Sequence, residues 1–125
     1  MENFLQQKLI ITAKIFNEQY TIEKHCNCLI DTGATISFIT SKTIKELGLT
    51  QTNTGKINVA FGKEQKTGLY ICLLLIKNHN KTLRLEMGEI QDRDDFDVII
   101  GMDIISKGEL IIRKNQFYFQ ILELL

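Results

Sequence analysis

The stretch Cys28-Leu29-Ile30-Asp31-Thr32-Gly33-Ala34 decides the fold, because an apolar run leads directly into an acid, a hydroxyl and a glycine. The apolar residues predict a buried strand, and Asp, Thr and Gly favour a turn after it. A strand that delivers a carboxylate onto a tight turn supplies a group for acid–base chemistry, so Asp31 is the candidate catalytic residue. A second apolar strand, Asp97-Val98-Ile99-Ile100, ends at Gly101 and repeats the pattern late in the chain.

Together the two motifs resemble those of the retropepsin-like aspartic proteases, which include the retroviral enzymes, bacterial relatives and the protease-like domain of DNA-damage-inducible ubiquitin-shuttle proteins. The resemblance spans Lys8 to Leu122, nearly the whole chain. It implies a mostly β fold, a closed retropepsin-like barrel with one or two short helices and one lobe per chain. It also implies an aspartic endopeptidase that needs no metal and no other cofactor.

Peptide hydrolysis by carboxylates needs two of them sharing one proton. One acts as a base toward water while the other gives a proton to the carbonyl oxygen. Since the chain has a single Asp-Thr-Gly, the second carboxylate is expected to be Asp31 of another copy across a two-fold axis. The expected enzyme is a homodimer acting on a peptide or protein substrate.

The resemblance also assigns roles to the residues around Asp31. Thr32 would hydrogen-bond to its symmetry mate and hold the two loops rigid, while Gly33 would let the peptide backbone approach closely. Ala34 completes this supporting loop. Ile100 and Gly101, in the second motif, would pack beneath the loop.

A hairpin between the motifs corresponds to the family's flap, which closes over substrate and excludes water. The flap and substrate-binding residues expected from this correspondence are Phe61, Gly62, Lys63 and Gly68. Its glycines are fewer than in the retroviral flaps.

One coupled departure separates the chain from the retroviral enzymes, which usually place an acid after the alanine and an arginine after the second glycine to form an ion pair. Here the two positions hold Thr35 and Met102. Because both partners are missing together, no charge is left unpaired. Asp103 is interpreted as the cap of a short helix from Ile104 to Lys107.

Runs of β-branched and apolar residues predict the other elements. Many short strands at turn-rich spacing with two brief helices indicate a mostly β, partly closed sheet structure. A helix is expected over Ser41–Gly48, with Thr40 or Ser41 as its cap and Gly48 as its left-handed stop. The expected strands are Leu9–Phe16, Tyr20–Ile22, Ile57–Phe61, Leu69–Ile76, Thr82–Met87, Glu109–Ile112 and Phe117–Leu122.

Length and charge bound the class of protein. The 125 residues predict one domain, 1–125, large enough to bury a core. Fifteen basic residues balance fifteen acidic ones, so no field is available to attract nucleic acid or an anionic membrane. The longest apolar run, Leu69–Ile76, is shorter than a membrane span, and the first residues carry an acid where a secretion signal has bases. A cytoplasmic protein is expected.

Two possible metal sites fail on spacing. Cys26 and Cys28 point to the same face of one strand and His25 to the other, and no Cys-x-x-Cys pair exists, so free buried thiols are expected at the three cysteines. In the acidic stretch 92–97, Phe96 occupies a position where calcium needs a ligand, and Asp97 one where the turn needs glycine. A solvated loop is expected there.

Two classes of function remain open from the sequence. The first is an active dimeric aspartic endopeptidase. The second is a dimerisation or peptide-binding module that keeps the fold but does not cut, because fold alone does not fix function. The intact Asp-Thr-Gly-Ala favours the first.

Overall fold

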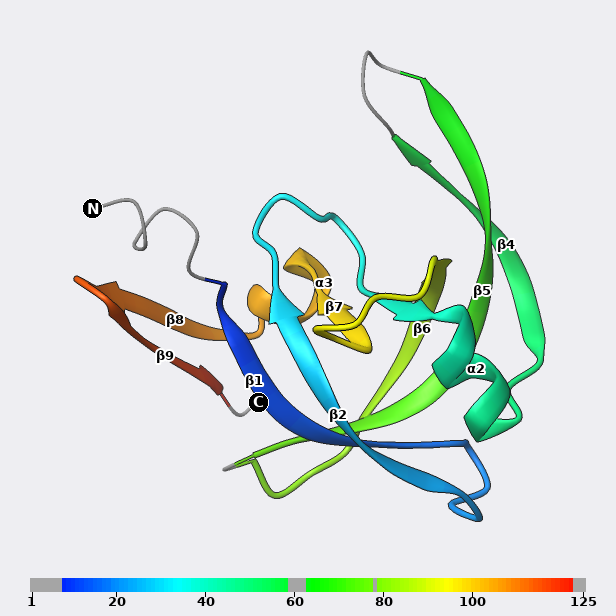
Figure 1. Cartoon of the computed structure of the whole chain (residues 1–125), viewed down its shortest axis with the longest axis horizontal. Helices are drawn as coiled ribbons and strands as arrows, with labels where there is room; N and C mark the ends of the chain where they lie inside the picture. The colour runs from blue at the N-terminus through cyan, green and yellow to red at the C-terminus, as the bar shows by residue number, and fades with distance from the viewer. Residues whose placement is uncertain (1–7, 59–62, 78, 123–125) are drawn as a thin grey trace.

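The computed structural model of the chain describes residues 8–58, 63–77 and 79–122 (Figure 1). The elements of this part of the chain are β1 (Ile10–Phe16), β2 (Glu23–Ile30), β3 (Phe38–Thr40), α2 (Ser41–Leu47), β4 (Gln51–Asn58), β5 (Glu64–Ile76), β6 (Leu83–Ile90), β7 (Val98–Ile100), α3 (Met102–Ile105), β8 (Gly108–Arg113) and β9 (Gln116–Ile121).

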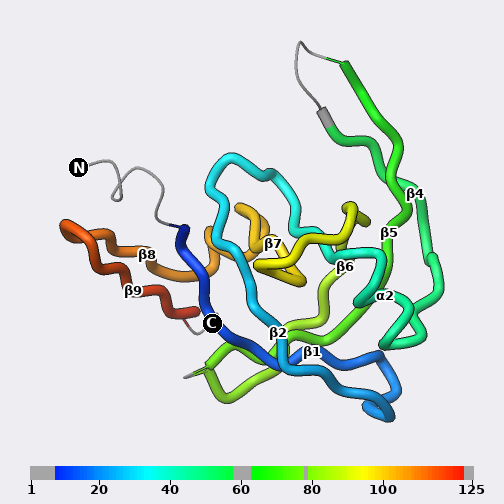
Figure 2. The backbone as a smooth tube through the Cα atoms, viewed as in Figure 1, coloured from blue at the N-terminus to red at the C-terminus, as the bar shows by residue number. Residues whose placement is uncertain are grey.

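Six strands form a closed barrel. They pair in the order β1-β2-β7-β3-β6-β5, and β5 returns to pair with β1. β4 pairs with the first part of β5, on the edge of β5 away from β6, and β8 pairs with β9 in a separate hairpin (Figures 1 and 2). The mostly β, closed-barrel fold expected from the sequence is therefore confirmed, with α2 and α3 as two short helices.

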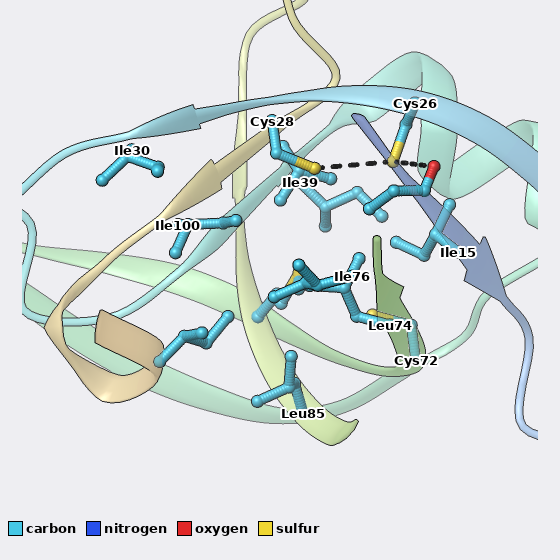
Figure 3. Packing of buried hydrophobic residues seen from close by; sticks show 14 of the residues in the cluster. Ile15, Cys26, Cys28, Ile30, Ile39, Cys72, Leu74, Ile76, Leu85 and Ile100 are labelled. Carbon is cyan, nitrogen blue, oxygen red and sulfur yellow. Dashed lines mark hydrogen bonds between the residues drawn. The ribbon is translucent and has the colours of Figure 1, made fainter. Parts of the chain in front are cut away.

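The barrel interior is filled by alternate residues of its strands, as period-2 patterning requires (Figure 3). The three cysteines belong to this core and are free and buried, as expected. The sulfur atoms of Cys26 and Cys28 lie 3.7 Å apart. Burial raises the pKa of the Cys72 thiol to about 12, so this thiol stays protonated at neutral pH.

Both ends of α2 follow the sequence signals. The side chain of Thr40 accepts a hydrogen bond from the Thr43 amide at the start, and Gly48 ends the helix with φ 64°, the left-handed conformation that glycine adopts without strain. At α3 the expectation was wrong. This helix begins at Met102 with Gly101 as its N-cap residue and no side-chain cap, so Asp103 lies inside the first turn instead of capping it.

The first hairpin, β1 with β2, has the expected position but a longer turn. The side chain of Asn17 accepts hydrogen bonds from the Thr21 and Ile22 amides, and Tyr20 adopts φ 57°. These bonds hold the backbone of residues 20–22 out of the ladder, and β2 begins only at Glu23. The strand predicted over Tyr20–Ile22 is therefore part of the turn.

The flap hairpin is longer than expected, because β4 begins at Gln51 and β5 at Glu64. Segment 64–68, expected in the connection, is strand.

The acidic stretch 92–97 is only partly solvated. Asp92 accepts a hydrogen bond from the Lys42 amide and Asp97 accepts one from the Asn27 amide, while Phe96 is buried. In the part of the chain that the structure describes, no helix has the length and apolar character needed to cross a membrane.

Candidate active site

Asp31 lies at the point where β2 ends and the chain turns. Its amide donates to the carbonyl oxygen of Ile100 at 2.9 Å, and its carbonyl oxygen accepts from the Ala34 amide at 3.2 Å. The carboxylate Oδ1 accepts from the Gly33 amide at 2.9 Å. The side chain is half-buried, so its position is fixed by backbone groups while solvent and a ligand retain access to it.

The two sequence motifs meet at this turn because β2 and β7 pair in parallel. Ile30 lies opposite Ile100, so the strands end side by side and deliver Asp31 and Gly101 to the same end of the barrel. The stretches that pair in parallel, 28–30 and 98–100, are both continuously apolar. The earlier part of β2 alternates instead, with exposed polar residues such as His25 and Asn27. The hydrogen bond from the Asp31 amide to the Ile100 carbonyl oxygen joins the two motifs at this point.

Gly101 allows the closest approach in the site. A Cβ atom there would lie 2.5 Å from the carbonyl oxygen of Ile36 and 2.8 Å from that of Ala34, so any other residue would push the loop away. The next amide, that of Met102, donates to the Ala34 carbonyl at 2.8 Å. The loop that follows Asp31 therefore rests directly on the start of α3.

Ser37 and Asp103 join the same arrangement; sequence reasoning missed Ser37 and gave Asp103 a different role, as a helix cap. The buried Ser37 hydroxyl accepts from the Gly101 amide at 3.0 Å and donates to Asp103 Oδ1 at 2.7 Å. Its amide donates to Asp103 Oδ2 at 3.1 Å. The available signal was a serine inside the apolar run Ile36-Ser37-Phe38-Ile39, because a buried hydroxyl needs a partner.

The other residues of the Asp-Thr-Gly-Ala motif surround the carboxylate. Thr32 and Gly33 are exposed and Ala34 is half-buried. A Cβ at Gly33 would contact Asp31 Oδ1 at 3.2 Å, so the absent side chain lets the Gly33 amide reach the carboxylate. The exposed Thr32 lies outside the barrel core.

The predicted flap residues are only partly brought together. The hairpin of β4 and β5 extends toward the end of the barrel where the Asp31 loop lies (Figure 1). Lys63 is exposed and directly precedes β5, whereas Gly68 lies within β5, paired with Thr54, and is not a tip residue. Phe61 and Gly62 lie outside the described residues.

No group of three or more His, Cys, Asp or Glu side chains within 8–58, 63–77 and 79–122 is placed to hold a metal ion. The site offers instead one carboxylate per chain, with backbone amides as its neighbours. Such a group can accept or give a proton, and it needs a second carboxylate to do both in one reaction.

Comparison with known proteins bears on this arrangement. The model of the family described as "gag-polyprotein putative aspartyl protease" matches residues 20–107, more than half of the chain and both motifs. No curated protein matches the chain.

Among solved structures, EIAV protease in complex with the inhibitor HBY-793 is similar with a TM-score of 0.52 and 21% identity, over 82% of this chain and 88% of that one. A retropepsin-like aspartic protease from Rickettsia conorii is similar with a TM-score of 0.51 and 19% identity, over 93% and 94% of the two chains. At these identities the similarity concerns the fold. With the family match, it identifies the chain as a member of the gag-polyprotein aspartyl protease family, with a retropepsin-like fold.

Proposed function

We propose that this protein is an aspartic endopeptidase that acts as a homodimer, with one Asp31 carboxylate from each copy. The observation that carries the proposal is the setting of Asp31, where the two family motifs meet: its amide donates to the Ile100 carbonyl oxygen, and its half-buried carboxylate accepts from the Gly33 amide. Each copy supplies only half of the acid–base pair, so the complete site lies between two copies.

In the proposed reaction the ionised Asp31 takes a proton from water as the water oxygen bonds to the substrate carbonyl carbon. The protonated Asp31 of the second copy gives its proton to the carbonyl oxygen, and a tetrahedral diol results. The Asp31 that took a proton from water then delivers it to the amide nitrogen, and the C–N bond breaks. One diol hydroxyl returns its proton to the pair as the new carboxyl group forms. The pair ends with the one shared proton it began with.

The β8–β9 hairpin supports a dimer. Its two strands pair only with each other within the described residues, and it projects from the barrel (Figure 1). Ile112 and Tyr118 are 54% and 48% exposed, on opposite faces of the hairpin. An exposed apolar hairpin is a surface that a second copy can cover.

The proposed substrate is an extended peptide lying between the Asp31 loop and the β4–β5 hairpin, with Thr32 and Gly33 beside the scissile bond. The exposed Gly33 leaves room for the peptide backbone, and the exposed Lys63 directly precedes β5. Peptides commonly bind such sites as an added strand, with main-chain hydrogen bonds giving affinity.

The direct test is cleavage of a peptide library, read by mass spectrometry, with Asp31→Asn as the matched variant. Asn is nearly isosteric, so the variant should keep the fold and the dimer, checked by circular dichroism and sedimentation, and lose cleavage. Activity of the variant above a few per cent of wild type would point to another nucleophile. A wild-type dimer that cleaves nothing across acidic and neutral pH would instead favour a peptide-binding module that does not cut.

A further inference from the structure

We propose that Asp103 is a positioning residue of this site: through Ser37 it holds Gly101 and the Asp31 loop in a fixed relation. The inference rests on the proposed function and extends it to a residue outside both sequence motifs. Asp103 does not reach the reacting atoms in this account. It acts through hydrogen bonds at the far end of the loop that begins at Asp31.

The direction of each hydrogen bond follows from the donors available. The Gly101 amide can only donate, so the Ser37 hydroxyl accepts from it and must send its own proton elsewhere. That proton goes to Asp103 Oδ1, and the Ser37 amide goes to Oδ2. A carboxylate offers acceptors only, so it satisfies both donors of Ser37 at once. Ser37 is 0% exposed, so water cannot reach it to take the place of the carboxylate.

The same segment holds both ends of the loop. Ile100, just before Gly101, receives the Asp31 amide, and Met102, just after it, donates to Ala34. Asp103 adds the third fixed point by anchoring Ser37, where the loop enters β3. A shift of Ser37 would therefore be transmitted to Gly101 and from there to the backbone that sets the Asp31 carboxylate.

Asp103 is the charged group that links α3 to the loop after Asp31. Thr35 and Met102 are exposed at the positions where the retroviral pattern has an ion pair. Hydrogen bonds to a charged acceptor are about twice as strong as neutral ones. Asp103 thus ties α3 to the loop with one charge and neutral donors, so no second charge has to be desolvated.

The test compares Asp103→Ala, Asp103→Asn and Ser37→Ala, with Asp94→Ala as the control for losing an exposed acid. Since small misplacements near reacting atoms can cost about a hundredfold in rate, Asp103→Ala and Ser37→Ala should lower kcat by about tenfold to a hundredfold with KM nearly unchanged. Asp103→Asn should lower kcat by less than Asp103→Ala does, because its amide oxygen can accept from one donor of Ser37 while its NH2 leaves the other donor without an acceptor. Asp94→Ala should match wild type.

A folded dimeric Asp103→Ala variant with wild-type kcat would overturn the inference while leaving the proposed function intact. So would a loss of kcat that disappears on cooling in step with recovery of the folded fraction, because that is a stability effect alone. A wild-type protein that cleaves no peptide would instead contradict the proposed function.

A second measurement does not depend on cleavage. Amide hydrogen exchange at Asp31 and Gly101 should be about tenfold faster or more in Asp103→Ala than in wild type, since local opening governs exchange at such sites. Asp94→Ala should exchange like wild type, and Asp103→Asn at a rate between those of wild type and Asp103→Ala. Unchanged exchange at Asp31 in the alanine variant would refute the positioning role even for a chain that cuts no peptide.

Discussion

The Asp31 amide donates to the Ile100 carbonyl oxygen at 2.9 Å, so the backbone of the first motif is fixed by the backbone of the second. The two residues are far apart in sequence and meet because β2 and β7 pair in parallel. A carboxylate set in this way depends on main-chain geometry, which side-chain substitutions in the barrel core affect only indirectly. The geometry of the site therefore depends most on residues such as Gly101, which allow the backbones of the two motifs to lie close together.

Gly101→Ala should destabilise the fold. The new Cβ would lie 2.5 Å from the Ile36 carbonyl oxygen, a backbone atom that cannot move aside without shifting the loop. Overpacking of this kind costs about 1–3 kcal/mol in the free energy of unfolding, measured by urea denaturation. Gly55→Ala is the matched control, because its Cβ would meet only the side chain of Leu69, which can rotate. Equal losses in the two variants would contradict this explanation.

Ile112→Lys should weaken self-association without unfolding the chain, because Ile112 is 54% exposed on the β8–β9 hairpin. A charge at the centre of an apolar contact commonly raises the dissociation constant about tenfold or more, measured here by sedimentation equilibrium. Activity per chain should then fall at low protein concentration and recover at high concentration. Ile22→Lys, at an exposed residue of the β1–β2 turn, should change neither quantity; a chain that stays active as a sedimenting monomer would refute the dimer.

The rate of peptide cleavage should follow a bell-shaped pH profile with its maximum on the acidic side of neutrality. One Asp31 of the pair must be ionised and the other protonated, so each limb reports loss of one of these states and belongs to the pair. Metal chelators and thiol reagents should leave the profile unchanged, because neither a metal-bound water nor a thiolate takes part. A rate that rises steadily into alkaline pH would exclude the shared proton.

Lys24 should make the stability of the fold depend on pH in the alkaline range. Burial lowers its pKa, but hydrogen bonds and charge from Glu46 and Asp97 outweigh burial and raise the pKa above its ordinary value of 10.5. The folded state therefore holds this proton more tightly than the unfolded state. The contribution to stability is complete below pH 10.5 and is lost as the pH rises through the higher folded-state pKa.

Urea denaturation at neutral and alkaline pH measures that contribution. Lys24→Met should show a smaller loss of stability above pH 10.5 than wild type does. Lys42→Met, at an exposed residue of α2, is the matched control and should keep the wild-type slope. Identical slopes in all three proteins would show that Lys24 gains nothing from its two acidic neighbours.

Local chemistry explains which parts of the fold could be predicted from the sequence. The last residues of β2 and the whole of β7 are apolar runs, because these two stretches pair in parallel within the barrel wall. Gly48 ends α2 through its own backbone preference, which needs no tertiary information. These local signals do not determine whether the sheet closes into a barrel. The closed barrel was predicted from the resemblance of the two motifs to a known family.

The errors at β4 and Asp103 occur where contacts between distant residues decide the structure, and the error at Tyr20 where a side chain bonds to nearby backbone. β4 reads Gln-Thr-Asn-Thr-Gly-Lys-Ile-Asn, mostly polar and exposed, and it is a strand because β5 pairs with it. Tyr20 belongs to a turn because the side chain of Asn17 captures the backbone after it. Aspartate is a common helix cap, but Asp103 bonds instead to Ser37, 66 residues away in the sequence. No local sequence pattern predicts this partner.

The long strand β5 has a mechanical consequence. Its first half pairs with β4, its middle with β6 and its end with β1. The β4–β5 hairpin is therefore anchored in the barrel at one end only, through the second half of β5. A force on the outer half of β5 is therefore transmitted along one unbroken strand to β1, which pairs with β2, the strand that leads to Asp31. The bending stiffness of the hairpin is set by the ladder between β4 and β5.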